Sequence, residues 1–326
     1  MSNRKERAKL KALLVKVEKY IDKKKYPCLY NGCTAPAIKS HSQQKNGPLR
    51  SIAEAGKVYR LDDNLQKSYN FGDGRFQIEF SQKGIGDSSL FRGFCNEHEK
   101  LFSIFEDQEI TPGNHKQFCV LFYRTLCYEK ARKRRESDRL ERFIEDGVHD
   151  LVTRRILKSK LDTDRAELVT SCDYLIDKAF NMISSDDYSL LSSRYIRVQG
   201  NLNVSCSSVL NLHLDDYIAY RKDNPNSPLP GFTFNILPGN EYSYIVLSWL
   251  AEFDCHAQWL LEGVSEKESL EVLLNRFAFC DSEDACVNPS LWRSLSSVDE
   301  IIKNMHHVSQ RGKLEDTMIP KIIKLP

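Results

Sequence analysis

Apolar residues recur at three- and four-residue steps in two long stretches of the chain, a spacing that predicts two long helices. The first stretch covers residues 3–25, ends before Pro27, and has an apolar face of Leu10, Leu13, Leu14, Val17 and Ile21. The second opens at Thr111-Pro112, with proline in its first turn, and we expect it to end near Gly147 because glycine commonly terminates helices. Its predicted buried stripe is Phe118, Leu121, Phe122, Thr125 and Leu126.

The segment between these helices, residues 26–100, has no long apolar pattern of its own. Short runs predict brief strands near Val58–Leu61 and Arg75–Phe80, and glycines mark turns around them. Such a segment buries little apolar surface by itself, so it needs an additional constraint to stay ordered.

The pattern changes after the second helix. A partly helical stretch extends to about residue 183, and the continuous apolar run Tyr244–Leu247 is typical of a strand covered on both faces. We predict strands at Arg194–Gln199, Leu202–Leu210, Gly231–Leu237 and Tyr242–Trp249, followed by helices near 251–262, 265–279 and 297–307.

These elements predict an α+β fold. The length of 326 residues suits about two domains of about 150 residues each. We expect residues 1–150 to contain the basic helix, the irregular module and the second long helix. Residues 151–189 would form a helical connector, and residues 190–326 a small mixed α+β domain.

The distribution of charge adds a functional indication. The formal net charge is +2, but residues 1–60 carry 15 Lys or Arg against 4 Asp or Glu, and the remainder carries 32 against 41. A basic front of this kind favours a polyanionic partner, although a solvated basic helix has the same composition. Because no apolar signal or membrane-spanning run is present, we expect a cytoplasmic protein with no membrane contact and reduced cysteines.

Four residues have the types and spacing of a zinc site. Cys28 and Cys33 flank a short loop in which Gly32 allows the turn that aims both sulfurs at one point. Cys95 and His98 lie three apart, which places them on one face of a helical turn. Three cysteines and one histidine are a tetrahedral donor set typical of structural zinc; the alternative is four unrelated residues.

A knuckle, a hairpin and a helix that carries the last two ligands resemble a treble-clef zinc finger, and the segment 26–105 resembles the HNH, or His-Me finger, nucleases. This resemblance implies a zinc-stapled treble-clef module flanked by long helices. It also implies that His41 is the general base and that Glu99 helps to hold a catalytic divalent cation, Mg²⁺ or Mn²⁺. Similar stretches occur in uncharacterised bacterial proteins, some of them linked to phage defence.

His41 has three interpretations. It is the base of a metal-dependent nuclease, or a substitute zinc ligand, or a structural histidine that hydrogen-bonds to the backbone. Around it, four cations are candidate phosphate-binding residues, to which the first helix and the basic block 130–135 would add: Lys39, Lys45, Arg50 and Lys57.

Two functions therefore remain open. In the first, the HNH-like module binds or cleaves nucleic acid. In the second, zinc only organises a surface of a non-catalytic interaction or regulatory protein, and the C-terminal domain recognises a protein partner. An acid and a histidine at helical spacing, Glu252 and His256, with Asp254 and Cys255 between them, are more typical of a polar helix face than of a catalytic dyad.

Overall fold

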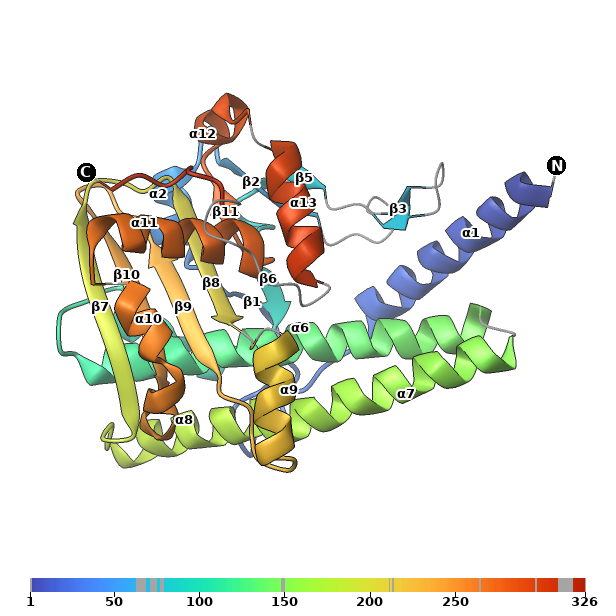
Figure 1. Ribbon diagram of the computed structural model, residues 1–326, viewed down its shortest axis with the longest axis horizontal. Helices are drawn as coiled ribbons and strands as arrows, with labels where there is room; N and C mark the ends of the chain where they lie inside the picture. Colours follow the sequence, from blue (N-terminus) through green and yellow to red (C-terminus); the bar gives the residue numbers. More distant parts are fainter. Residues whose placement is uncertain are drawn as a thin grey trace.

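The computed structural model describes residues 2–62, 69–70, 75–76, 79–147, 150–210, 212, 214–263, 265–296, 298–309 and 319–325. Helices and an antiparallel sheet are mixed along the chain (Figure 1), which confirms the predicted α+β class.

The main sheet has seven strands in the order β5-β2-β11-β8-β9-β10-β7, with every neighbouring pair antiparallel. The strands predicted after residue 190 are present as β7 to β10, with their ends shifted by a few residues. The seven strands are β2 (Lys57–Leu61), β5 (Phe80–Gly84), β7 (Leu191–Gln199), β8 (Val204–Leu210), β9 (Phe232–Leu237), β10 (Tyr242–Leu250) and β11 (Cys286–Val287).

Two two-stranded sheets lie outside this sheet. In the first, β1 (Lys39–His41) pairs with β6 (Leu90–Arg92), and in the second, β3 (Tyr69–Asn70) pairs with β4 (Arg75–Phe76). The single strand expected at Arg75–Phe80 therefore divides between β4 and the start of β5, and residues 77–78 of that prediction lie outside the described residues.

The two long predicted helices are present as α1 and α6. The α-helices are α1 (Ser2–Lys23), α2 (Arg50–Ile52), α4 (Asn96–Glu99), α5 (Ser103–Glu106), α6 (His115–Gly147), α7 (Leu151–Glu167), α8 (Tyr174–Ser185), α9 (Leu214–Asp223), α10 (Gln258–Gly263), α11 (Lys267–Arg276), α12 (Pro289–Ser294) and α13 (Val298–Ser309). Short 3₁₀ and π segments are η1 (Lys45–Leu49), η2 (Lys100–Phe102), η3 (Leu168–Asp173), η4 (Ala251–His256) and η5 (Phe277–Asp281).

Helix α6 begins later than the sequence predicts. Thr111-Pro112 forms a turn that ends in Gly113 at φ +73°, a left-handed conformation that interrupts a helix. Asn114 then accepts a hydrogen bond of 3.1 Å from the backbone N–H of Gln117, the contact of a helix cap. The helix therefore starts at His115.

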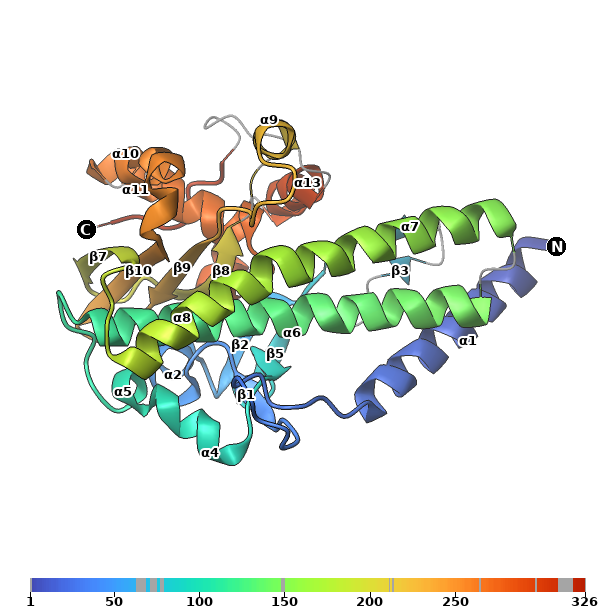
Figure 2. The same ribbon diagram turned by 90° about the horizontal axis from the view of Figure 1, so that it is seen from below.

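Helix α6 lies in the middle of the molecule. The sheet covers one side of it, and the segment that carries β1, β6, α4 and α5 covers the other, as Figure 2 shows. Helices α10 and α11 lie on the opposite face of the sheet (Figures 1 and 2). The central strands β8 and β9 are consequently buried along their whole length, as expected for strands covered on both faces.

The sheet does not follow the predicted boundaries at residues 150 and 190. Strands β2 and β5 come from the first predicted unit, yet β2 pairs with β11, and the register joins Arg60 to Cys286. A two-stranded hairpin is at best marginally stable alone, so this edge gains its stability from the C-terminal half. One hydrophobic core also runs from Cys28 to Ile323.

A buried carboxylate joins the two halves. Asp284 is 1% exposed and accepts hydrogen bonds from Ser42 Oγ at 2.7 Å and Tyr128 OH at 3.0 Å. It also accepts one from Gln43 Nε2 at 3.1 Å, and Arg60 Nη2 lies 3.6 Å from its Oδ1. Because buried charges are stable only when they are paired and hydrogen-bonded, this network requires the two halves to pack together.

We expect Asp284→Ala to lower the free energy of unfolding by about 3 kcal/mol, because it leaves buried donors and a buried guanidinium without their acceptor. Chemical denaturation measures this change. The matched control is Glu283→Ala, whose side chain is 52% exposed in its ion pair with Arg132 and should contribute less than about 1 kcal/mol. Equal effects of the two substitutions would contradict the role of Asp284.

Candidate metal centre and the adjoining pocket

The four predicted metal ligands lie together. The donor atoms of Cys28, Cys33, Cys95 and His98 are all within 4.8 Å of one another. His98 Nδ1 is 3.5 Å from Cys28 Sγ and 3.2 Å from Cys95 Sγ. A tetrahedral zinc site, with Zn–S of about 2.3 Å and Zn–N of about 2.0 Å, has S···N edges of about 3.5 Å. These four residues can therefore hold a metal ion.

The knuckle has the local structure that its sequence predicts. Gly32 has φ +76°, a conformation that costs glycine little, and the Cys33 N–H donates to the Tyr30 carbonyl at 3.0 Å. The Leu29 N–H donates to the Gly93 carbonyl at 2.8 Å. This last bond joins the knuckle to the segment that carries the second pair of ligands.

The second pair lies at the start of α4. Cys95 is the residue before this helix, and the backbone N–H groups of His98 and Glu97 lower the pKa of its thiol, which favours the thiolate that binds metals. Burial instead raises the pKa of Cys28 to about 11. The ring of His98 stacks on Tyr30, with centroids 3.8 Å apart, which fixes the orientation of the imidazole.

The two predicted catalytic residues line one pocket of about 770 Å³ beside this cluster, and so do two of the predicted phosphate-binding residues, Lys45 and Arg50. Lys39 and Lys57, the other two, are exposed but do not line it. Strand β1 positions His41, and Glu99 is the last residue of α4. The structure thus brings together four of the six residues predicted for nucleic-acid chemistry.

His41 is a partly buried histidine with one ring nitrogen that has no partner among the described residues. Burial lowers the pKa of His41, and the positive charges of Arg124 and Lys45 lower it further. A hydrogen bond with the Ile85 backbone and the negative charge of Glu106 act in the opposite direction. The ring is therefore neutral near pH 7, and its unpaired Nε2 is enclosed by the surrounding side chains.

Glu99 accepts a hydrogen bond of 2.7 Å from Ser40 Oγ. Burial raises the pKa of Glu99, and the nearby carboxylate of Glu106 acts in the same direction. The hydrogen bond fixes one carboxylate oxygen toward β1.

Arg124 is a pocket residue that the sequence analysis missed. It is 1% exposed, forms an ion pair with Glu106 and donates to the Ser42 carbonyl at 3.0 Å. Its guanidinium also lies over the Phe105 ring, 4.8 Å from the centroid. The one signal in the sequence is that Arg124 is the single charge in the run Phe118–Leu126, but its partner Glu106 lies outside that run and cannot be identified from spacing.

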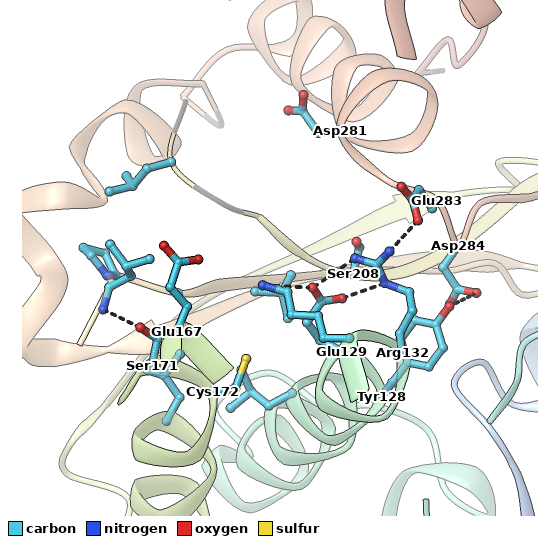
Figure 3. Close-up of a pocket in the computed structure, with 18 of the residues that line it drawn as sticks. Tyr128, Glu129, Arg132, Glu167, Ser171, Cys172, Ser208, Asp281, Glu283 and Asp284 are labelled. Carbon is cyan, nitrogen blue, oxygen red and sulfur yellow. Dashed lines mark hydrogen bonds and ion pairs between the residues drawn. The ribbon is translucent and has the colours of Figure 1, made fainter. Parts of the chain in front are cut away.

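The basic block 130–135 does not form a free cationic surface. Arg132 is bound to Glu129 and Glu283, at 3.0 and 2.5 Å, beside a second pocket of about 320 Å³ (Figure 3). Lys130 pairs with Asp173 at 2.5 Å, and Arg134 lies over the Tyr26 ring. Most of these cations are thus engaged in ion pairs within the fold, whereas Arg134 contacts an aromatic ring, and the contribution of this block to phosphate binding stays a prediction.

The residues around His256 have structural contacts. Glu252 accepts a hydrogen bond from Tyr174 OH, and Asp254 accepts one from Trp249 Nε1, both at 2.7 Å. These contacts fit the polar helix face that the sequence favoured over a dyad.

Comparison of the chain with protein-family models, curated proteins and solved structures found no match. None of the helices in the described part of the chain has the length and apolar character needed to cross a lipid bilayer.

We expect purified protein to contain about one zinc ion per chain. The Cys95→Ser variant should lose this ion, because a structural zinc site needs all four of its ligands. Elemental analysis by mass spectrometry measures the metal. Loss of the ion should also destabilise the fold, since structural zinc contributes on the order of 10 kcal/mol to small modules.

The matched control is Cys255→Ser, at an exposed cysteine outside the cluster, which should keep the full metal content. A folded wild-type protein without metal, or a Cys95→Ser variant that retains it, would contradict the assignment.

Proposed function

We propose that the chain holds one structural zinc ion through Cys28, Cys33, Cys95 and His98, and that its HNH-like module binds nucleic acid and cleaves a phosphodiester in the adjoining pocket. The observation that carries this proposal is the convergence of His41, Glu99 and two cations on one pocket beside the metal cluster. A role in phage defence stays a prediction from the sequence pattern.

The order of elements supports a treble-clef arrangement. The knuckle at Cys28–Cys33 is followed by β1, and β6, which pairs with β1, precedes α4, which begins beside Cys95. The ligands thus come from a loop and from a helix start, with a two-stranded sheet between them. A metal ion would fix these three parts relative to one another, and with them the positions of His41 on β1 and Glu99 on α4.

The chemistry of the pocket supports phosphodiester cleavage. A neutral His41 can accept a proton from an attacking water molecule, and Lys45 and Arg50 supply charge for phosphate. Glu99 and Glu106 offer the carboxylate oxygens that Mg²⁺ and Mn²⁺ prefer. Such a cation, when bound, would stabilise the developing negative charge.

One observation favours the second candidate, a non-catalytic interaction or regulatory protein. Among the described residues, the Cys28–His98 cluster is the only group of three or more such side chains close enough to hold a metal. Glu99 and His41 do not form a second group in this conformation. In that case the pocket binds a partner without cleavage.

We expect His41→Ala to abolish nicking of supercoiled plasmid in the presence of Mg²⁺ or Mn²⁺, because the substitution removes the proposed base. DNA binding should be retained, because the cationic residues of the pocket are unchanged. Because burial lowers the pKa of His41, wild-type cleavage should persist at about pH 6.5, the ordinary pKa of histidine, and fall only at lower pH, where protonation of His41 removes its acceptor.

The control for this experiment is His115→Ala, at an exposed histidine outside the pocket, which should cut like wild type. Equal activity of wild type and His41→Ala, or no cleavage by wild type that binds DNA, would favour the second candidate.

We expect the double variant Lys45→Glu, Arg50→Glu to weaken DNA binding and to flatten its salt dependence, because each lost phosphate contact lowers the slope of log K against log salt by about one. Fluorescence anisotropy at several salt concentrations measures both effects. Lys130→Glu is the control, since its ammonium pairs with Asp173; the same loss in both variants would show a non-specific charge effect instead.

A further inference from the structure

The outward face of α7 is unusually apolar for a surface. Leu151, Val152 and Ile156 are 78%, 68% and 63% exposed, more than any other large apolar side chain in the described part of the chain. The helix packs on α6 through its other side, where Leu161 is 4% exposed. Exposed apolar patches of this kind mark interaction sites.

The charges of α7 are divided along its length. Residues 151–160 contain four cations and no acid, whereas residues 161–167 contain three acids and one cation. Arg155 and Asp162 are exposed, and neither has an ion-pair partner within the described ranges. A second copy of the helix in antiparallel orientation would place each basic half against an acidic half.

The side chains on one exposed face of α7 are larger in the first half of the helix than in the second half. At 3.6 residues per turn, Val152, Arg155, Ser159, Asp162 and Ala166 lie on one exposed face. A two-fold axis at Ser159 relates position 152 to 166 and position 155 to 163. Val152 then meets the partner's Ala166, and Arg155 lies beside the partner's Asp162.

A hollow is present where the exposed end of the partner's helix would lie. A shallow pocket of about 600 Å³ is lined by Ala166, Thr170, Ile218 and Pro225 among others, where α9 lies across the junction of α7 and α8 (Figure 1). Ile218 is itself 56% exposed. The same axis relates position 151 to 167, which brings the partner's Leu151 to this pocket.

We propose that the chain forms a two-fold symmetric dimer in which α7 packs antiparallel against α7 of a second copy. The contact is isologous, so that each surface element occurs twice. Leu151 and Val152 of each protomer fill the pocket beside Ile218 of the other, and Arg155 pairs with the partner's Asp162. The axis passes near Ser159, where the small side chain permits close approach of the helices.

The test is a charge exchange measured by light scattering coupled to size exclusion, over a range of protein concentrations. We expect wild type to be dimeric, and Arg155→Asp and Asp162→Arg each to weaken dimerisation by about tenfold or more, equivalent to ~1.4 kcal/mol. The double variant should restore the dimer, because the two-fold contact then has the same pairs reversed. Circular dichroism checks that each variant is folded.

The control is Lys321→Asp, a charge reversal at an exposed residue of the C-terminal segment, which should leave the dimer unchanged. The proposal would be overturned if the wild type is monomeric, if neither single substitution weakens the dimer, or if the double variant stays monomeric.

A second measurement locates the axis. In a Cys255→Ser background, which removes the exposed native thiol, Ser159→Cys should form a disulfide-linked dimer on mild oxidation. Thr153→Cys, exposed on a different side of α7, should not. Equal cross-linking of the two positions would place the contact elsewhere.

Discussion

The enclosure of the first half of α6 is the constraint on which the rest of the structure depends. Nearly every residue from Gln117 to Ala131 is buried, a pattern that a helix shows only when protein surrounds it. Two adjacent polar residues mark the two sides: Arg124 bonds to Ser42 of the module that carries the metal cluster, and Thr125 Oγ1 bonds to Asn235 of the sheet at 3.1 Å. One helix thus supports both the proposed chemistry and the sheet.

This arrangement explains how the pocket is assembled. Its walls come from β1 and helices of the metal-side module, from Arg124 on α6, and from the loop at Pro238 between β9 and β10. Ser51 Oγ donates to the Pro238 carbonyl at 2.9 Å and joins the metal-side module to this loop. The position of His41 therefore depends on the sheet as well as on the metal cluster, although it lies next to neither in sequence.

The sequence predicted what local spacing determines. The ligand set, the strands after residue 190 and most helix positions follow from short-range patterns, and the structure places them as expected. The sequence did not predict that β2 joins β11, that Arg132 pairs with Glu283 or that Lys130 pairs with Asp173, because these contacts join distant segments. Arg124 was overlooked for a related reason: a buried charge is recognised only when its partner, Glu106, is known.

The pairing of Arg60 with Cys286 has a consequence for synthesis on the ribosome. Strands β2 and β5 (Lys57–Leu61 and Phe80–Gly84) are synthesised well before their neighbour β11 (Cys286–Val287), and pairing over such a sequence distance is slow. The four metal ligands, in contrast, are complete once residue 98 has left the exit tunnel. Metal capture is therefore a long-range contact that the nascent chain can make before β11 is synthesised, so it can order the segment around the ligands while β2 still lacks this neighbour.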